Sequence, residues 1–259
     1  MNNSLITFWN KITDLILPKE ERVRQLETLG PDGLFDKIPR SDNFDFETSK
    51  IKAIFNYKTA LCRQAIWEIK YRANKKLIRD FSLLLYEYIL EDLSDLETFN
   101  NFKKPFLVPI PSSREREKEK GFNQCKLIVR ELIKIDQERK GDNFRLLENF
   151  LIKKVDTPHQ TKVSNRKKRL ENLRGSFSVS SHQSLGETLV TISYKKAPPK
   201  AFRAISGALS EESFGRGLNS CFILIDDVIT TGATMNEAFR ALNSAGYNPQ
   251  KIRGYALAH

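Results

Sequence analysis

The sequence predicts an α/β fold built around a mainly parallel sheet. Short apolar segments of strand length alternate along the chain with longer segments whose apolar residues recur at helical spacing, which is typical of parallel sheets with right-handed crossovers. The clearest unit is 222–242, where a continuous apolar run leads through a short loop into an amphipathic helix. With 259 residues, 40% of them hydrophobic, the chain can form one large domain or one domain with an extension.

Residues 1–50 are predicted as an amphipathic helix and an arm that precede the main domain at 51–259. Apolar side chains share one face of a helix over 1–17, and Pro18 ends it. We expect this face to pack on the main domain, and a membrane surface or a partner protein is the alternative. The rest of the arm is polar and is predicted to contain one short helix near 20–29.

The first half of the main domain is predicted to alternate strands with helices. Residues 51–57 are a strand candidate, and Thr59 is a candidate N-cap for the helix that follows. A second helix is predicted over 77–89, and a basic junction at 70–75 separates the two helices. The next strand, 105–111, is short, apolar and closed by proline.

The charged segment 112–120 follows that strand directly. Its arginines and lysines alternate with glutamates, a pattern that a helix would also explain. We expect a ligand-binding loop here, because open α/β sheets bind ligands beyond the carboxyl ends of their strands. A helix with apolar positions at Leu127, Ile128, Leu132 and Ile135 comes next.

The second half of the main domain is less regular. Residues 145–155 and 251–258 are predicted strands. Between them, 178–220 is hydrophilic and long for a loop, which indicates an insertion or a flexible lid with one small strand at 190–194. The segment before it is strongly basic, which indicates either a solvated surface or a contact with nucleic acid. Its four consecutive cations are Arg166, Lys167, Lys168 and Arg169.

Composition restricts the class of protein. The formal charge is +11, from 43 basic and 32 acidic residues. This charge favours ligands such as phosphates or nucleic acid, but a solvated basic surface would explain it equally well. The three cysteines, Cys62, Cys125 and Cys221, form no C-x-x-C pair, so we expect no zinc site and no disulfide framework. No apolar run is long enough to span a bilayer, and the N-terminus lacks the features of a signal peptide. We therefore expect a cytoplasmic protein without stable membrane insertion.

The stretch 222–235 carries the most chemistry. Its strand ends in two adjacent carboxylates, Asp226 and Asp227, and a hydroxyl-rich loop leads from them into the helix. The loop comprises Thr230, Thr231, Gly232, Ala233 and Thr234. A loop at a helix N-terminus favours phosphate, and glycine lets the backbone approach an anion closely. The carboxylates suit sugar hydroxyls or, through water, Mg²⁺. The stretch thus predicts a site for a phosphorylated ribose, and an ordinary strand–turn–helix is the alternative.

This stretch resembles the phosphoribosyl-pyrophosphate (PRPP) motif of type I phosphoribosyltransferases, which has an apolar strand, Asp-Asp and then Thr-Thr-Gly-Ala-Thr. Further segments resemble the ComF family of competence-associated, phosphoribosyltransferase-like proteins. Pro109-Ile110-Pro111 and Lys120-Gly121-Phe122-Asn123-Gln124 are similar to its Pro-x-Pro strand end and its Arg-Gly-Phe-Asn-Gln segment. Its pattern Gln…Arg-x-x-Asn-x-x-Gly-x-Phe is matched by Gln160, Arg169, Asn172, Gly175 and Phe177, and its Lys-Tyr pair by Lys70 and Tyr71.

Two features depart from the family pattern. ComF proteins commonly begin with a four-cysteine zinc ribbon, whereas residues 1–50 contain no cysteine, so zinc binding does not carry over. Lys120 stands where arginine is usual, which keeps the charge but loses the planar fork of the guanidinium group.

The resemblance implies a type I phosphoribosyltransferase-like fold with PRPP lying across the carboxyl ends of the strands. The loop 230–234 would hold the 5′-phosphate. Asp226 and Asp227 would form the catalytic pair, bind the ribose hydroxyls and hold Mg²⁺ through water. Arg116 and Lys120 would neutralise the pyrophosphate leaving group. The expected reaction is phosphoribosyl transfer to an acceptor that the sequence does not identify, in a protein linked to DNA uptake and competence.

Two alternatives remain open at the level of sequence. One is a PRPP- or nucleotide-binding competence protein with little catalysis, which binds single-stranded DNA through the basic run 166–169. The other is a regulator whose contact with nucleic acid responds to PRPP. Protein partners from the competence machinery are expected in each case, because fold alone does not fix function.

Overall fold

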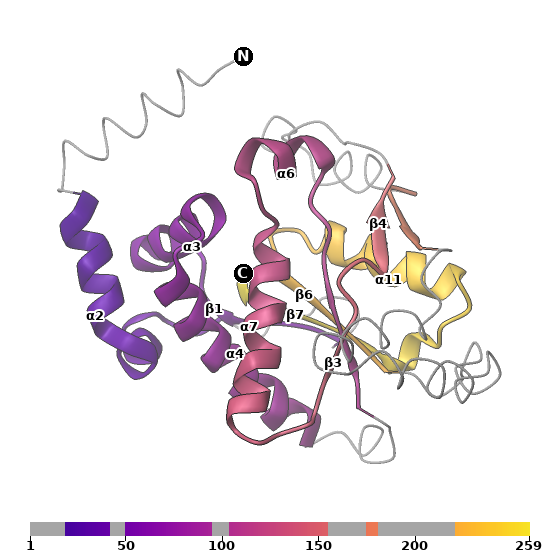
Figure 1. Ribbon diagram of the computed structural model, residues 1–259, viewed down its shortest axis with the longest axis horizontal. Coiled ribbons are helices and arrows are strands. Elements are labelled where there is room, and N and C mark those ends of the chain that lie inside the picture. The colour runs from indigo at the N-terminus through magenta and orange to yellow at the C-terminus, as the bar shows by residue number, and fades with distance from the viewer. Residues whose placement is uncertain (1–18, 42–49, 95–103, 155–174, 181–220) are drawn as a thin grey trace, which may run out of the picture.

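The computed structural model describes residues 19–41, 50–94, 104–154, 175–180 and 221–259 (Figure 1). Several predictions fall outside these residues, namely the helix at 1–17, the motif residues Gln160 to Asn172 with the basic run 166–169, and the insertion from 181 to 220. They stay predictions.

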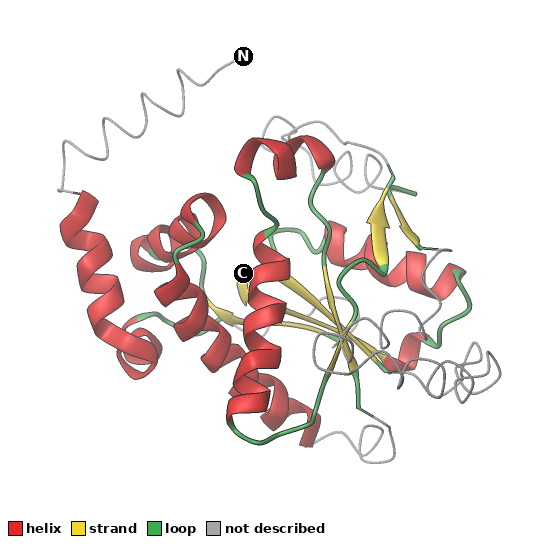
Figure 2. Cartoon of the chain, in the orientation of Figure 1, coloured by secondary structure: helices red, strands yellow, loops and turns green. Residues whose placement is uncertain are grey.

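A five-stranded parallel sheet forms the centre of the molecule (Figure 2). In spatial order its strands are β1 (Ile51–Phe55), β7 (Ile252–Ala258), β6 (Phe222–Val228), β2 (Phe106–Pro109) and β3 (Arg145–Leu146). Each neighbouring pair runs parallel. The predicted α/β fold with a mainly parallel sheet, as expected of a type I phosphoribosyltransferase-like domain, is confirmed.

The sheet is covered on both faces, which explains the continuous apolar run in β6. Side chains of successive strand residues point to opposite faces. Ile223 and Ile225 belong to one buried cluster, whereas Phe222 and Leu224 belong to another. Both clusters need apolar partners, so every residue of the strand before the acid pair is apolar.

Helices cover the first face, and a helix with a small sheet covers the second (Figure 1). The first layer comprises α2 (Lys19–Lys37), α3 (Ala60–Arg72), α4 (Lys75–Ser94) and α7 (Gln124–Glu138). The second layer comprises α11 (Ala233–Ser244) and the antiparallel pair β4 (Leu151–Lys153) and β5 (Phe177–Val179). None of the helices in the described segments combines the length and the apolar character that a bilayer span requires.

Local signals set several helix ends, and the cap predicted at Thr59 is confirmed. The side chain of Thr59 caps α3 by accepting a hydrogen bond from the N–H of Cys62 at 3.3 Å. Asn123 caps α7 in the same way, with the N–H of Cys125 at 2.8 Å. Gly246, which follows the end of α11, has a φ of 91°.

Three expectations on local structure need correction. The segment predicted as a ligand loop contains α6 (Arg114–Lys120), a helix that Ser113 caps, so its alternating charges reflect helical spacing. The strand predicted at 145–155 is two short strands in different sheets, because the chain leaves the main sheet after Leu146. The short helix predicted in the arm is the longer α2, which is bent at Gly30 (φ 63°).

Candidate functional site

The acid pair lies at the carboxyl end of β6, the central strand, and both carboxylates are buried. Asp226 Oδ1 accepts a hydrogen bond from the N–H of Asp227 at 2.9 Å and lies 3.5 Å from Cys125 Sγ, a thiol donor. Asp227 Oδ1 accepts one from the N–H of Val228 at 2.7 Å. These contacts fix the orientation of both carboxylates.

The second carboxylate oxygen of Asp227, Oδ2, contacts one side chain from α3 and one from α7. Lys70 Nζ of α3 lies 3.3 Å from Asp227 Oδ2, and Gln124 Nε2 of α7 donates to the same oxygen at 2.9 Å. Burial by itself would lower the pKa of Lys70, but the charges of Asp227 and Asp226 outweigh it and the pKa is raised. Lys70 is therefore a permanent cation beside the pair.

Crowding of two carboxylates has an electrostatic consequence. Burial, followed by the charge of Asp227, raises the pKa of Asp226 to about 7. The charge of Lys70 acts in the opposite direction. A cation or a hydroxyl donor placed on the pair would favour its fully ionised form.

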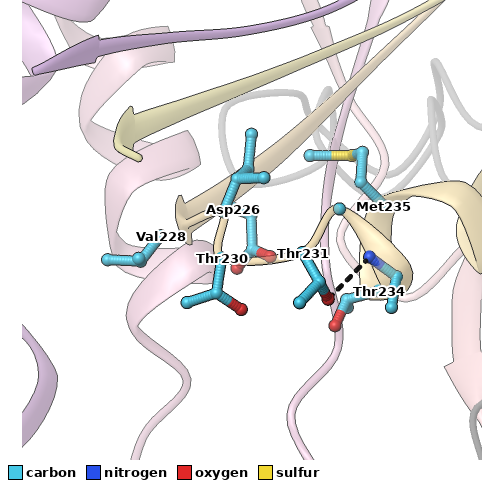
Figure 3. A pocket seen from close by; sticks show the side chains of 9 residues that line it. Asp226, Val228, Thr230, Thr231, Thr234 and Met235 are labelled. Atoms are coloured by element: carbon cyan, nitrogen blue, oxygen red, sulfur yellow. Dashed lines mark hydrogen bonds between the residues drawn. The ribbon is translucent and has the colours of Figure 1, made fainter. Parts of the chain in front are cut away.

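The threonine loop and the start of α11 line a small pocket together with Asp226 (Figure 3). Gly232 occupies the N-cap position with a φ of 72°, a left-handed conformation that suits glycine. Thr231 Oγ1 accepts a hydrogen bond from the N–H of Ala233 at 3.4 Å. Since Gly232 has no side chain to cap α11, the helix N-terminus offers backbone N–H donors to an anion. Figure 3 also shows Thr230 and Thr234 on this loop.

The predicted pyrophosphate-binding residues come from α6. Burial lowers the pKa of Lys120, and after it the strongest influences are the charges of Asp227, Lys70 and Arg116, in that order. Lys120 therefore lies within electrostatic reach of the acid pair. Arg116 acts on the same ammonium group and is half-buried.

The structure adds three residues to the candidate site that the sequence did not assign to it: Lys70, Gln124 and Cys125. Lys70 and Gln124 lie in segments that resemble the ComF pattern. The sequence therefore marked both positions, but it did not indicate that they contact the acid pair. Nothing in the sequence pattern singled out Cys125 as a site residue.

The motif residues Gly175 and Phe177 lie elsewhere. The N–H of Gly175 donates to Glu237 Oε1 of α11 at 2.5 Å, and Phe177 is buried in the cluster beneath that helix. These two residues support α11, whose N-terminus lines the pocket with the threonine loop.

One group of described residues has the spacing of a metal site. Ligand atoms of Cys125, Asp226 and Asp227 all lie within 4.8 Å of one another. Mg²⁺ prefers oxygen ligands and retains several waters, so the two carboxylates fit it and the thiol does not. The acid pair is thus compatible with the water-mediated Mg²⁺ expected from the sequence.

Comparison with known proteins identifies two relatives. No family model matches the chain. Competence protein ComFC of Bacillus subtilis is 27% identical over 72% of this chain and 68% of its own length. Competence protein F of Haemophilus influenzae is 25% identical over 74% of this chain and 66% of its own length. Together with the parallel α/β fold, these likenesses confirm the predicted resemblance of the chain to the ComF family of competence proteins.

Proposed function

We propose that the protein binds PRPP with Mg²⁺ in the cytoplasm and transfers its phosphoribosyl group to an acceptor, in a role linked to competence and DNA uptake. The observation that supports this is the position of the acid pair. The N-terminus of α11 shares a pocket with Asp226, while Lys70 and Lys120 act on Asp227. A sugar with phosphate at both ends fits a pair of carboxylates that adjoins two anion-attracting surfaces.

Each group has a role in the proposed transfer. The loop 230–234 holds the 5′-phosphate, and Asp226 and Asp227 accept hydrogen bonds from the ribose hydroxyls. When bound to this pair through water, Mg²⁺ supplies positive charge to the pyrophosphate. The bond from the anomeric carbon to pyrophosphate breaks and a bond from the acceptor forms. Lys120 and Arg116 stabilise the charge on the departing pyrophosphate, and the acid pair stabilises the positive charge on the sugar.

Calorimetric titration tests the binding step. We expect PRPP with Mg²⁺ to bind more tightly than ribose 5-phosphate or pyrophosphate alone. The variant Asp227→Asn should weaken PRPP about 10- to 150-fold, the worth of a hydrogen bond to a charged group. Asp36→Asn, which removes an exposed carboxylate on α2, should change nothing. If PRPP binds no better than ribose 5-phosphate, the proposal is wrong.

Turnover is tested separately. Release of pyrophosphate from PRPP should require Mg²⁺ and an acceptor, and it should disappear in Asp227→Asn. A broad acceptor screen without turnover, in a protein that still binds PRPP, would contradict the transferase.

That outcome would favour a second candidate, which the names of both relatives as competence proteins support. In this candidate the protein binds PRPP and single-stranded DNA without catalysis, and works with partners in the competence machinery. It predicts DNA affinity that falls steeply with salt and weakens when residues 166–169 are neutralised. DNA affinity that changes with PRPP would indicate the regulator instead.

A further inference from the structure

The thiol of Cys125 lies next to the acid pair and has no role in the proposed function. Its Sγ is 3.5 Å from Asp226 Oδ1, and the residue is 2% exposed. The thiol comes from α7 and the carboxylate from β6, 101 positions later in the sequence. A thiol is a weak hydrogen-bond donor, so it satisfies a buried carboxylate poorly. The packing of α7 against the sheet thus places a soft metal ligand beside a hard one.

Asp226 also has one carboxylate oxygen to spare. Oδ1 accepts the N–H of Asp227 and faces the thiol, whereas Oδ2 has no hydrogen-bond or ion-pair partner within the described part of the chain. The residue is only 9% exposed, and it lines the pocket beside the threonine loop (Figure 3). A buried carboxylate oxygen without a donor is costly, and a cation that enters through this pocket would remove that cost.

The ligand atoms have the spacing of a tetrahedral metal site. In such a site sulfur lies about 2.3 Å and a carboxylate oxygen about 2.0–2.2 Å from zinc, which places the two ligand atoms about 3.5–3.7 Å apart. The observed 3.5 Å between Cys125 Sγ and Asp226 Oδ1 agrees with this separation. A ligand atom of Asp227 completes the group, within which all atoms lie no more than 4.8 Å apart. The fourth position remains for water.

The chemistry of these ligands selects a thiophilic ion over Mg²⁺. Thiolate prefers Zn²⁺ and similar ions, whereas Mg²⁺ requires an octahedron of oxygen ligands. Two carboxylates and a thiolate bring three negative charges together, and the ion pair between Lys70 and Asp227 balances one of them. A divalent cation balances the other two. The site differs from a zinc ribbon, in which pairs of neighbouring cysteines supply the ligands.

We propose that Cys125, Asp226 and Asp227 form a binding site for a thiophilic divalent cation such as Zn²⁺. As the bond between metal and sulfur forms, the thiol releases its proton to solvent, so a proton leaves with each ion bound. The ion occupies the carboxylates that would otherwise face the ribose hydroxyls, and it therefore excludes the phosphorylated sugar. This consequence rests on the proposed function, whereas the cation site itself does not.

Titration of the full-length protein with Cd²⁺ tests the site, because a bond between cadmium and thiolate absorbs in the ultraviolet. The protein is kept reduced with a phosphine, since thiol reductants bind the metal themselves. We expect a charge-transfer band that saturates at about one ion per chain. Zn²⁺ should displace Cd²⁺ and abolish the band, whereas an excess of Mg²⁺ should leave it in place. Histidine does not produce this band, so the three histidines of the chain do not interfere.

Three variants identify the ligands. Cys125→Ser keeps a hydroxyl donor for Asp226 but removes the soft ligand, so the band should disappear. Zn²⁺ affinity should fall at least about 10-fold, because even groups that only support a metal ligand contribute that much. Asp226→Asn keeps the thiol and should weaken Zn²⁺ by a similar factor. Cys221→Ser removes another buried free thiol and should behave as the parent protein. Urea unfolding without metal verifies that each variant is folded.

PRPP binding in the presence of Mg²⁺, measured with and without Zn²⁺ at a concentration that fills the site, tests the consequence. Zn²⁺ should weaken PRPP at least about 5-fold in the parent protein, the lower end of ordinary coupling between ligands. In Cys125→Ser, PRPP affinity should be the same with and without Zn²⁺. Chelation of PRPP by Zn²⁺ in solution would act on both proteins alike, so the difference between them reports on the site.

The parent protein alone can overturn the proposal, because absence of the cadmium band would show that no thiolate binds the ion. A band that survives in Cys125→Ser, or Zn²⁺ affinity that is unchanged in Asp226→Asn, would also overturn it. Unchanged PRPP affinity with Zn²⁺ bound would show that the ion does not exclude the sugar. Loss of PRPP binding without any Zn²⁺, in a protein that shows the band, would refute the proposed function and leave the cation site standing.

Discussion

Replacing Lys70 by methionine tests whether the acid pair depends on this one cation. The ammonium lies 3.3 Å from Asp227 Oδ2, and the lysine side chain is 23% exposed. At that distance the attraction is about 5 kcal/mol for an effective dielectric constant of 20 and about 1.3 kcal/mol in water. Solvent screening at a partly exposed side chain places the expected loss of unfolding free energy between these values, at about 2–3 kcal/mol near pH 8.

The loss should depend on pH in a direction that the pair itself determines. The pKa of Asp226 is raised to about 7, so the folded state binds a proton that the unfolded state has lost. The destabilising contribution of Asp226 therefore grows as pH rises from the ordinary carboxyl range toward 7. Without the ammonium that pKa rises further, and the deficit of Lys70→Met should keep growing above pH 7. Lys70 stays charged throughout, because its own pKa is raised.

Urea unfolding at pH 6 and pH 8.5 measures the effect. We expect Lys70→Met to lose at least about 1 kcal/mol more at the higher pH, which is close to one unit of pKa. Lys134→Met on α7 is the matched control, since that lysine is 60% exposed and pairs only with Glu131 and Glu138 among the contacts described. It should lose about 0.5 kcal/mol or less at both pH values. Equal losses for Lys70→Met at the two pH values would refute the reasoning.

Three further predictions concern single residues. Gly232→Ala should destabilise the fold by about 1–2 kcal/mol, because Gly232 has a positive φ, and it should also weaken phosphate binding. Gly246→Ala, at another positive φ, should destabilise the fold without changing phosphate affinity. Equal phosphate affinity in both variants would contradict the prediction that the loop 230–234 binds phosphate. Burial raises the pKa of the Cys125 thiol well above its ordinary value, so iodoacetamide should label Cys125 at pH 8 only after unfolding. Rapid labelling of Cys125 in the native protein would contradict its burial. Tyr255→Phe removes the hydrogen bond from the Tyr255 hydroxyl to Asp92 Oδ2 at 2.6 Å, which leaves Lys52 as the remaining donor to that partly buried carboxylate among the contacts described. The variant should cost about 1.5–3 kcal/mol in urea unfolding, the usual contribution of a hydrogen bond to a charged group, and an unchanged midpoint would refute this.

The sequence predicted those parts of the fold that depend on neighbouring residues. The strand β6, the loop after it and the helix α11 follow from a continuous apolar run, one glycine and a helical spacing of apolar residues. The cap at Thr59 is equally local. For the same reason the sequence placed the acid pair and the threonine loop together, because eight residues or fewer separate them.

Contacts between distant segments were not predictable in this way. Gln124 donates a hydrogen bond to Asp227 although the two residues are 103 positions apart in the sequence, and nothing in either segment specifies this contact. Lys70 was predicted as part of a basic junction between helices, but only packing of α3 against β6 brings its ammonium to the acid pair. The loop predicted at 112–120 is a helix over Arg114–Lys120, because its alternating charges follow helical spacing and Ser113 caps it. Burial of Leu26 and Leu34 in α2 was hidden by the polar residues around them.

The central position of β6 has a consequence for how the site moves. Amide hydrogens of a central strand covered on both faces exchange with solvent mainly when the whole domain unfolds. The acid pair is attached to that strand, so its geometry should persist for as long as the protein is folded. Lys70 and Lys120 belong to separate helices at the periphery of the sheet. The geometry of the acid pair is thus fixed by global stability, while the two lysines can adjust to a ligand without disturbing the carboxylates.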